Sequence, residues 1–287
     1  MEIFDRGKLK KLYKPAPESS GEDNGQVTLI GGSKLFHGAP LLSLKVASKL
    51  VDMVFFASPE TSVGEVAEKI KSQLMSFIWV PWEETDAYIE KSDAILIGPG
   101  MMRFASESQI PNSKFQIPNY DKEGEKTRKI TERLLKKFPQ KKWVIDAGSL
   151  QVMESTWISE GAVVTPNQKE YKYLFGEMVP EEASKKYNCV IVVKGPKTLV
   201  CSPNECVEVT NGNPGLTKGG TGDVLAGLTV ALLAKNDSFL AASSASYIAK
   251  SAADELYKKV GTNYNADDLA DKIPETLFNL LKLTQTP

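Results

Sequence analysis

The sequence predicts an α/β fold, a three-layer αβα sandwich with a mainly parallel central sheet. Short apolar runs bounded by turn residues recur along the chain, and segments with helical spacing separate most of them. This alternation is typical of a parallel sheet that is covered by helices on both faces. With 287 residues, of which 41% are hydrophobic, the chain has enough apolar side chains for one large core.

Seven of the apolar runs have the length and composition of buried strands. They are "VTLIGG" from Val27, "MVFFASP" from Met53, "FIWVPW" from Phe77, "AILIGPG" from Ala94, "WVIDAGS" from Trp143, "AVVTPN" from Ala162 and "VIVVKGP" from Val190. The helical segments between them cover residues 39–51, 63–74, 125–138 and 170–176. Two later runs, "TLVCSPN" from Thr198 and "CVEVTNG" from Cys206, predict an antiparallel hairpin.

The chain has neither an internal repeat nor a linker, so we expect one domain over residues 1–287. Residues 1–25 are expected to form a partly ordered arm. Residues 103–124 contain two prolines, several Ser and Asn and no clear period, which indicates an inserted loop. A loop of this length in a compact domain is usually functional. It is a candidate lid or homo-oligomer contact, and an ordinary surface insertion explains it equally well.

Charge and cysteine content exclude several classes of function. The 35 basic and 36 acidic side chains leave no field that would attract nucleic acid. No window approaches the roughly 18 apolar residues of a membrane span, and the N-terminus lacks the apolar core of a signal peptide. We therefore expect a cytoplasmic protein that binds neither nucleic acid nor membranes. Three cysteines without a C-x-x-C pair, and the single histidine His37, indicate reduced thiols and no zinc site.

Polar or glycine residues follow several of the expected strands. In an open parallel sheet, ligands bind in the crevice at the carboxyl ends of the strands. We therefore expect the chemistry to gather around the following residues: Gly31–Gly32–Ser33, Gly98–Pro99–Gly100, Asp146, Asn167 and Lys194–Gly195.

The stretch "NGNPGLTKGGTGDVLAGLTVALLA", residues 211–234, places five glycines and one carboxylate before an apolar segment of helical length. A helix that begins near Thr221 or Gly222 would direct free amide groups at the glycine loop. With the helix dipole, which contributes about 0.3–1 kcal/mol, these amides favour an anion. The stretch lacks the spacing of a P-loop and of the dinucleotide fingerprint, so it predicts a different type of anion hole.

Asp223 lies in the first turn of this expected helix. An acidic residue there favours the helix dipole, which is one explanation of it. The alternative is catalytic, because a carboxylate beside an anion hole can accept the proton of a substrate hydroxyl while the amides stabilise a phosphoryl group in transfer. The surrounding glycines favour the catalytic explanation.

Several motifs together resemble the ADP/ATP-dependent NAD(P)H-hydrate dehydratases of the ribokinase-like superfamily. They occur in the family's order and near its spacing, and the resemblance covers roughly residues 20–260. The motifs are "GGSKLFHGAP" at 31–40, "GPGM" at 98–101, "VIDAGSL" at 144–150, "VVTPNQKEY" at 163–171, "VIVVKGPKTLV" at 190–200 and "GGTGDVLAGL" at 219–228.

The resemblance implies that the protein transfers a phosphoryl group from ADP or ATP, with Mg²⁺, to the ring hydroxyl of hydrated NADH or NADPH. Loss of phosphate then restores the reduced cofactor. Asp223 would be the base, and Gly219, Gly220, Thr221 and Gly222 would form the anion hole. Ala39 and Gly100 match family contacts to the hydrated nucleotide, and tight packing is their alternative explanation. The segment that matches the family's border of the adenine nucleotide is Lys194, Gly195, Pro196, Lys197 and Thr198.

The sequence departs from the family at the substrate side. Asn167 replaces the histidine that the family usually has, and with Glu170 it fits the N-x-x-E pattern of ribokinase-type sugar kinases, which organises magnesium and its waters. A helix cap formed by Asn167 and Glu170 explains the same residues. His37 is expected at the rim of the pocket and is not assigned to catalysis.

Two other classes of function remain open on these residues. A small-molecule kinase for a sugar, hydroxymethylpyrimidine or thiazole alcohol would share Asp223 and the anion hole, and would release its phosphorylated product. A nucleotide-binding regulator without turnover is the third, and the presence of Asp223 argues against it.

Overall fold

The computed structural model describes residues 2–104 and 120–283. All the strands of this part of the chain lie in one 10-stranded sheet, in the order β1-β10-β9-β8-β7-β6-β5-β2-β3-β4. The expected insertion at 103–124 falls largely on residues 105–119, which lie outside the described residues. Its last residues, from Tyr120, belong to a helix.

The seven expected strands and the hairpin are confirmed. The seven strands pair in parallel with one another, whereas the strand after them is antiparallel to both of its neighbours. The bounds are β2 Gln26–Ile30, β3 Met53–Ala57, β4 Ile78–Trp79, β5 Ala94–Ile97, β6 Lys142–Ile145, β7 Val163–Val164, β8 Val190–Val193, β9 Thr198–Cys201 and β10 Cys206–Val209.

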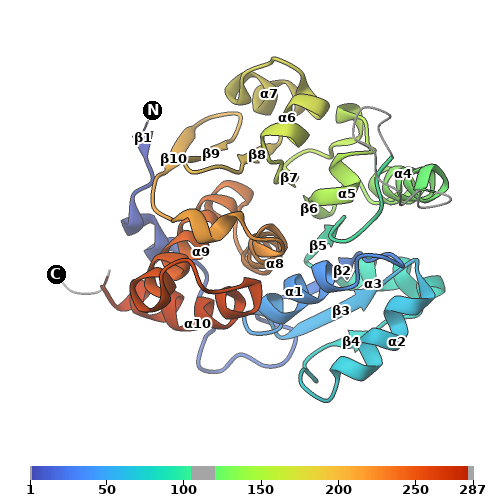
Figure 1. The fold of residues 1–287 in the computed structure, drawn as a ribbon, viewed down its shortest axis with the longest axis horizontal. Helices are drawn as coiled ribbons and strands as arrows, with labels where there is room; N and C mark the ends of the chain where they lie inside the picture. Colours follow the sequence, from blue (N-terminus) through green and yellow to red (C-terminus); the bar gives the residue numbers. More distant parts are fainter. Residues whose placement is uncertain (1, 105–119, 284–287) are drawn as a thin grey trace.

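Helices cover both faces of the sheet, as the alternation predicts (Figure 1). One layer contains α1 Gly38–Ala47, α2 Thr61–Ile70, α8 Thr221–Leu233, α9 Ser238–Val260 and α10 Ala266–Leu283. The other contains α3 Thr85–Lys91, α4 Tyr120–Lys137, α5 Ala147–Leu150, α6 Gln168–Phe175 and α7 Pro180–Tyr187. Within the described ranges, none of these helices is long and apolar enough to cross a membrane.

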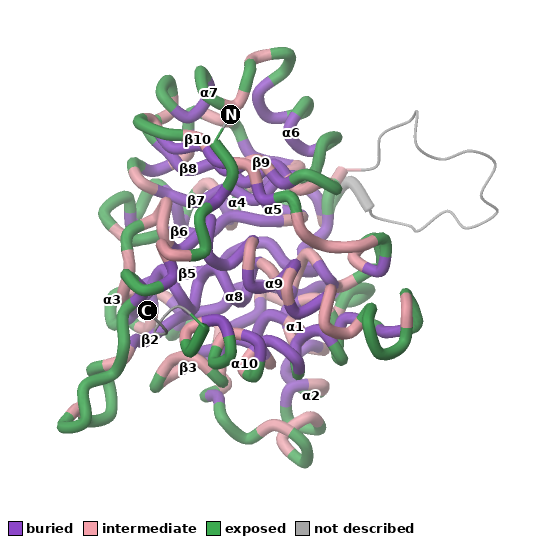
Figure 2. Tube along the Cα trace, turned by 90° about the vertical axis from the view of Figure 1, so that its left-hand side faces the viewer, coloured by how far each residue is buried: buried purple, intermediate pink, exposed green. Residues whose placement is uncertain are grey.

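The core is divided by the sheet, because successive side chains of a strand point to opposite faces. In β2, Leu29 packs in the cluster beneath α1, α8, α9 and α10, whereas the next residue, Ile30, packs on the opposite face. Figure 2 shows the strands and the inner faces of the helices buried, with the exposed segments around them. Such strands, covered on both faces, explain the continuous apolar runs of the sequence.

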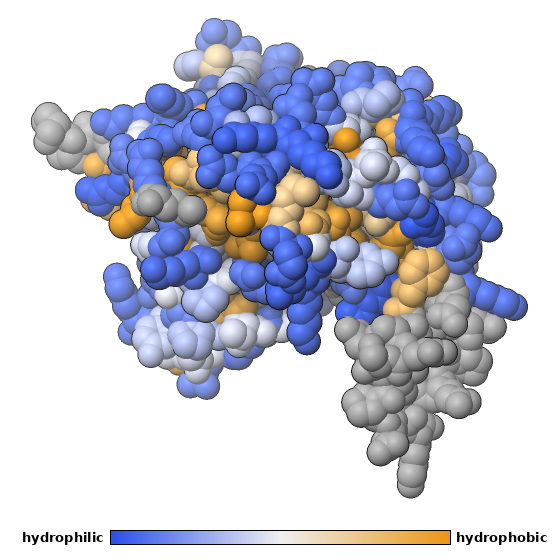
Figure 3. Space-filling view, turned by 90° about the horizontal axis from the view of Figure 1, so that it is seen from above, coloured by the Kyte–Doolittle hydropathy of each residue, from blue (hydrophilic) through white to orange (hydrophobic). Residues whose placement is uncertain are grey.

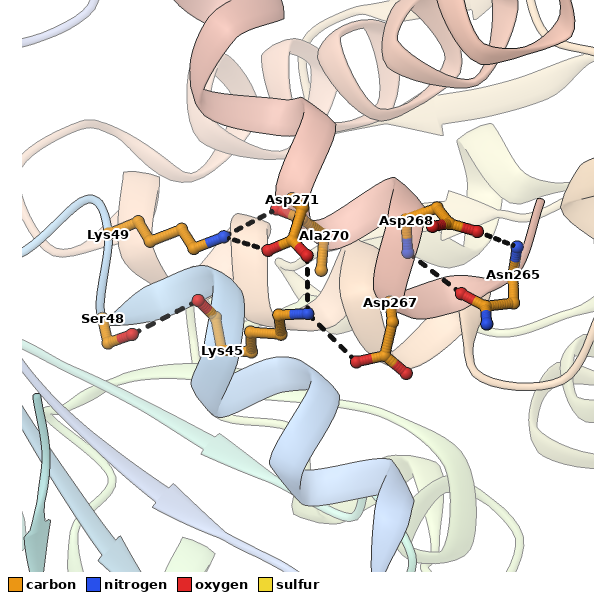
Figure 4. Close-up of polar contacts among 8 residues, drawn as sticks. All are labelled: Lys45, Ser48, Lys49, Asn265, Asp267, Asp268, Ala270 and Asp271. Atoms are coloured by element: carbon orange, nitrogen blue, oxygen red, sulfur yellow. Dashed lines mark hydrogen bonds and ion pairs between the residues drawn. The ribbon is translucent and has the colours of Figure 1, made fainter. Parts of the chain in front are cut away.

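Polar contacts join helices that are far apart in the sequence. Lys45 of α1 reaches both Asp267 and Asp271 of α10, at 3.1 Å and 2.8 Å, and Lys49 lies 2.6 Å from Asp271 (Figure 4). These pairs lie on the surface, so each contributes little stability by itself. They fix the position of α10 beside α1.

The N-terminal arm adds to the sheet. Strand β1, Glu2–Ile3, pairs in parallel with β10, and the 3-10 helix η1, Arg6–Lys11, follows it. Leu9 of this helix is fully buried, and η1 packs against α9 and α10.

Figure 3 shows the face seen from above Figure 1, where apolar residues form a band between hydrophilic residues.

The expectation of reduced cysteines is wrong for two of the three. Cys201 and Cys206 form a disulfide, because the register of the hairpin places them directly opposite each other. Cys189 is a buried free thiol, as expected, and burial raises its pKa to about 12.

Candidate active site

Three charged side chains meet where strands β6 and β8 end and helix α8 begins. Asp146 follows β6, Lys194 follows β8 and Asp223 lies in the first turn of α8. The Lys194 ammonium lies 2.7 Å from Asp146 Oδ1. The sequence therefore predicts correctly that these strand ends share one edge of the sheet.

The first turn of α8 has no side-chain cap. Its N-cap residue is Gly220, whose φ of 93° lies in the left-handed region. A methyl group on Gly220 would lie 2.5 Å from Leu42 Cδ1 and 2.8 Å from Ala266 Cβ, so glycine is required there for space as well as for backbone geometry. Within the described residues, the amides of Gly219, Gly220 and Gly222 have no hydrogen-bond acceptor. This end of the helix can therefore bind an anion.

The loop that leads into α8 is held by its own side chains. Asn213 accepts from the amide of Gly215 and from the hydroxyl of Tyr264, at 3.0 Å and 2.8 Å. Thr221 Oγ1 donates to the carbonyls of Leu216 and Lys218. Thr221 therefore shapes the loop through its side chain, while the glycines next to it leave their amides free.

Asp223 has the electrostatic environment of a general base. Burial raises its pKa to about 7, the negative charge of Asp146 acts in the same direction, and Lys194 opposes both. Its main-chain carbonyl accepts a hydrogen bond from the Ser43 hydroxyl of α1, at 2.7 Å. A carboxyl group with a pKa near 7 combines partial ionisation at neutral pH with a useful basicity.

Lys194 is held over the start of α8. Its side chain is 20% exposed, and a methyl group on Gly222 would lie 3.5 Å from its Nζ atom. Burial alone would lower the pKa of Lys194, but the charges of Asp146 and Glu170 outweigh it and the pKa is raised. The ammonium therefore stays charged, at the place where the free amides of α8 begin. A phosphate at this end of α8 would meet both.

Asn167 and Glu170 cap helix α6, which is the structural alternative given above for these residues. Asn167 Oδ1 accepts from the amides of Lys169 and Glu170, and Glu170 Oε2 accepts from the amide of Asn167 at 2.8 Å. The other oxygen of Glu170 accepts from Gln151 Nε2 at 2.9 Å. Burial raises the pKa of Glu170, although Lys194 lowers it.

The remaining segments surround this cluster. Lys194 forms an isolated bridge with Asn167, which brings the start of the 194–198 segment beside α6. In this segment Pro196 and Lys197 are exposed, Thr198 is buried, and Lys197 reaches Glu208 at 3.3 Å. The chain beside Lys194 is therefore accessible to solvent at Pro196 and Lys197.

The glycine-bearing loops after β2 and β5 pack directly on each other. A methyl group on Gly100 would lie 2.5 Å from the carbonyl oxygen of Phe36, so the tight-packing explanation of Gly100 holds in the structure. Ala39 lies in the first turn of α1 and is half-buried, and His37 precedes that helix without a capping bond. A small cavity of about 10 Å³ lies beside these loops and is lined by Gly32, Ser33, Met101 and Met102 with residues of α4 and of the 59–60 turn.

The sequence assigns no individual role to three polar groups that shape the site, although Asp146 is among the strand-end residues where the chemistry is expected to gather. Asp146 is 1% exposed and holds Lys194, Gln151 holds Glu170, and Lys250 of α9 is also buried. Asp146 had a signal in the sequence, because it follows a buried strand. Gln151 is the C-cap residue of α5 and Lys250 lies within α9, and the sequence gives no sign of which groups these two side chains contact.

The fold and the site define an α/β protein of the ribokinase-like type. A ribokinase-like protein of Enterococcus faecalis superposes with a TM-score of 0.77 at 21% identity, over 97% of this chain and 96% of that one. The ADP/ATP-dependent NAD(P)H-hydrate dehydratase of Bacillus subtilis, co-crystallised with ATP and Mg²⁺, superposes with a TM-score of 0.75 at 21% identity, over 97% and 98%. At these identities the likeness establishes the fold.

Sequence comparison identifies the family. The family model described as NAD(P)H-hydrate dehydratase matches residues 27–275. The bifunctional NAD(P)H-hydrate repair enzyme of Methanocaldococcus jannaschii is 34% identical over 295 residues, 99% of this chain and 53% of the relative. The ADP-dependent (S)-NAD(P)H-hydrate dehydratase of Cenarchaeum symbiosum is 27% identical over 91% of each chain. The chain belongs to the NAD(P)H-hydrate dehydratase family, and it spans about half the length of the bifunctional relatives.

Proposed function

We propose that this protein dehydrates hydrated NADH or NADPH at the expense of an adenine nucleotide. The observation that carries the proposal is the position of Asp223, a carboxyl group with a raised pKa beside an uncapped helix end and the partly buried ammonium of Lys194. Membership of the dehydratase family supports this substrate. A relative named for ADP and a fold neighbour crystallised with ATP and Mg²⁺ support the nucleotide.

In the proposed reaction, the oxygen of the ring hydroxyl attacks the terminal phosphorus of the nucleotide, and Asp223 accepts the proton of that hydroxyl. The bond between that phosphorus and the bridging oxygen breaks. The amides of Gly219, Gly220 and Gly222 stabilise the negative charge of the phosphoryl group in transfer, in the loop that Thr221 holds. Phosphate is a good leaving group. When the C–O bond breaks, a proton leaves the neighbouring ring carbon for solvent, and the C=C bond that forms restores the reduced nicotinamide ring.

The remaining assignments follow from the family resemblance. Residues 194–198 border the adenine nucleotide in this proposal, with Lys194 directed at its phosphates. Ala39 and Gly100 border the hydrated nicotinamide in this proposal, as the family resemblance implies, although Gly100 also packs tightly against the loop that carries Phe36. Asn167 stands where the family usually has a substrate-contacting histidine, but it forms a bridge with Lys194 and its side-chain oxygen is already engaged in the cap of α6.

In this proposal a magnesium ion arrives with the nucleotide, and Glu170 is the carboxylate that assists in holding it. Across residues 2–104 and 120–283, no three His, Cys, Asp or Glu side chains are grouped as a metal cage. Mg²⁺ is commonly held by one or two carboxylates together with substrate phosphates and waters, so the absence of such a group is compatible with it. Glu170 would contribute through water. The ion would neutralise phosphate charge when bound.

The experiment is product analysis with purified protein. Hydrated NADPH is supplied with Mg²⁺ and either ADP or ATP, and regenerated NADPH and released phosphate are measured together. We expect both products in equal amounts. A stable phosphorylated alcohol formed from a sugar, hydroxymethylpyrimidine or thiazole alcohol, with no NADPH regenerated, would instead establish the kinase. A hydroxyethylthiazole kinase of Pyrococcus horikoshii superposes less well, with a TM-score of 0.55 at 18% identity.

A further inference from the structure

Helix α9 presents a row of polar groups to the loops beside the candidate site. The carbonyl of Tyr247 and the side chains of Lys250, Ser251 and Asp254 are spaced by three, four and seven residues, which places them on one face of the helix. All four hydrogen-bond to segments outside α9. This face belongs to none of the motifs that define the family resemblance.

Lys250 links two of those segments. Its ammonium donates to the carbonyl of Pro196 at 2.7 Å and to the carbonyl of Val209 at 3.0 Å. The residue is 6% exposed. Burial lowers the pKa of Lys250 to about 8, although the charges of Asp254 and Glu208 oppose the shift. A buried lysine is costly, and these two hydrogen bonds are its direct compensation.

The neighbours of Lys250 hold the next part of the chain. Asp254 accepts from the amide of Gly212 at 2.9 Å and from Asn213 Nδ2 at 3.1 Å. Asn211 Nδ2 donates to Ser251 Oγ and to the carbonyl of Tyr247. These contacts fix residues 211–213, the beginning of the loop that ends at the free amides of α8.

Lys250 is therefore the side chain of this row that ties the 194–198 segment to the strand end before the glycine loop. We propose that Lys250 is a positioning residue for the adenine nucleotide, which holds the turn at Pro196 at a fixed distance from the loop that binds the phosphates. The inference rests on the proposed function, because that function places the nucleotide between these two segments.

A positioning role for Lys250 differs from a general role in folding, because it should affect nucleotide binding more than the stability of the fold. Without the ammonium, the carbonyls of Pro196 and Val209 lose their donor and the two segments lose their common anchor. Hydrogen bonds to charged groups are among the stronger ones, and small misplacements of a binding group have large effects. Nucleotide binding should therefore weaken, while the pocket for the hydrated cofactor, formed by the loops after β2 and β5, should not change.

The test compares Lys250→Met with Lys141→Met. Lys141 Nζ also donates to two carbonyls, of Glu90 at 2.6 Å and Ser92 at 2.9 Å, but it precedes β6, at the opposite end of that strand from Asp146. Calorimetry measures the Kd of ADP and of ATP with Mg²⁺ for the wild type and both variants. Kinetics then give kcat and the KM of each substrate, and thermal melting reports folding.

We expect Lys250→Met to raise the nucleotide Kd and KM about tenfold, with the KM of hydrated NADPH unchanged and kcat at saturating nucleotide within about threefold. Lys141→Met should bind nucleotide as the wild type does. Equal nucleotide affinity in folded Lys250→Met, or the same loss in Lys141→Met, would overturn the inference. If Lys250→Met does not fold, Lys250→Gln, which removes the charge and has a shorter reach toward the two carbonyls, takes its place under the same criteria. A wild type that binds nucleotide without regenerating NADPH would overturn the proposed function and leave this inference standing.

Discussion

Helices α6 and α8 both begin near the carboxyl ends of the central strands, yet their first turns are built in opposite ways. At α6, Asn167 and Glu170 form a complete capping box, so the chain itself satisfies the amides. At α8, Gly220 occupies the N-cap position with a φ of 93° and no side-chain bond. Both helices present the same main-chain chemistry, and only the residue at the cap differs.

The difference between the two caps shows how a helix end can be left available for a ligand. The Asn167 cap stabilises α6 by about 1 kcal/mol relative to alanine at that position, whereas Gly220 gives α8 no side-chain hydrogen bond. Glycine at the cap also removes the side chain that would occupy the space of a ligand. The end with unused amides is the one that carries Asp223 and faces Lys194. The start of α6 thus contributes to stability, whereas the start of α8 is available for ligand binding.

The largest expected effect is that of Asp223→Asn. Removing a positioned base lowers turnover by about 10²–10⁴-fold. The amide side chain has nearly the same shape, so the nucleotide Kd should stay close to that of the wild type. Steady-state kinetics and calorimetry measure the two quantities. Turnover equal to that of the wild type would reject the role of Asp223.

Substitution of the cap of α8 is expected to be the most damaging change to stability. Gly220→Ala places a methyl group 2.5 Å from Leu42 Cδ1 and forces a left-handed φ on a residue with a side chain. We expect a loss of about 2–4 kcal/mol in the free energy of unfolding, measured by denaturant titration. Gly219→Ala is the matched control, because no other described atom lies within 4 Å of the added methyl group. Equal losses in both variants would contradict the steric argument.

The buried carboxyl group of Asp223 should make stability depend on pH. Its pKa is raised from 3.8 to about 7 in the folded protein, so the folded state binds the proton more tightly than the unfolded state. This contribution is fully present below about pH 4 and is lost as the pH rises through about 7. Because the pKa rises from 3.8 to about 7, the free energy of unfolding of Asp223→Asn should exceed that of the wild type by up to about 4 kcal/mol at about pH 8, and this difference should vanish near pH 4. Melting curves at both pH values measure it, and a gain independent of pH would exclude this cause.

The smallest expected effect is that of Asn167→Ala. It removes the cap of α6 and should lower the free energy of unfolding by about 1 kcal/mol, as measured by denaturant titration. Since the Asn167 oxygen is engaged with the amides of Lys169 and Glu170, turnover should fall far less than in Asp223→Asn. A loss of turnover as large as that of Asp223→Asn would show that Asn167 acts on the substrate.

Much of the fold follows from local pattern. The apolar runs that begin at Val27 and Ala94 are neighbouring central strands, because continuous burial on both faces requires continuous apolar sequence. The pairing of β1 with β10 has no such signal, since two residues are too few for a pattern and the partner is far away in the chain. The disulfide was missed for a related reason. The hairpin was expected, but its register decides whether Cys201 faces Cys206.

The site could be predicted from the sequence at positions where the residue type is unusual for the expected secondary structure. Glycines before an apolar helix, and a lysine directly after a buried strand, are both unexpected unless they bind something, and Asp223 and Lys194 do lie together. Asn167 could not be assigned, because a helix cap and a ligand contact require the same side chain. Lys250 lies in an Ala- and Ser-rich segment, whose small residues indicate a buried helix, so a lysine within it was a usable signal.

The central claim is that the unused amides at the start of α8 bind the phosphates of the nucleotide. The most direct measurement follows the amide resonances of ¹⁵N-labelled protein as ADP and Mg²⁺ are added. We expect large, saturable shifts for Gly219, Gly220 and Gly222, and small ones for Lys169 and Glu170, whose amides are already bonded to the Asn167 side chain. Glycine amides that stay in place while the nucleotide binds would contradict it.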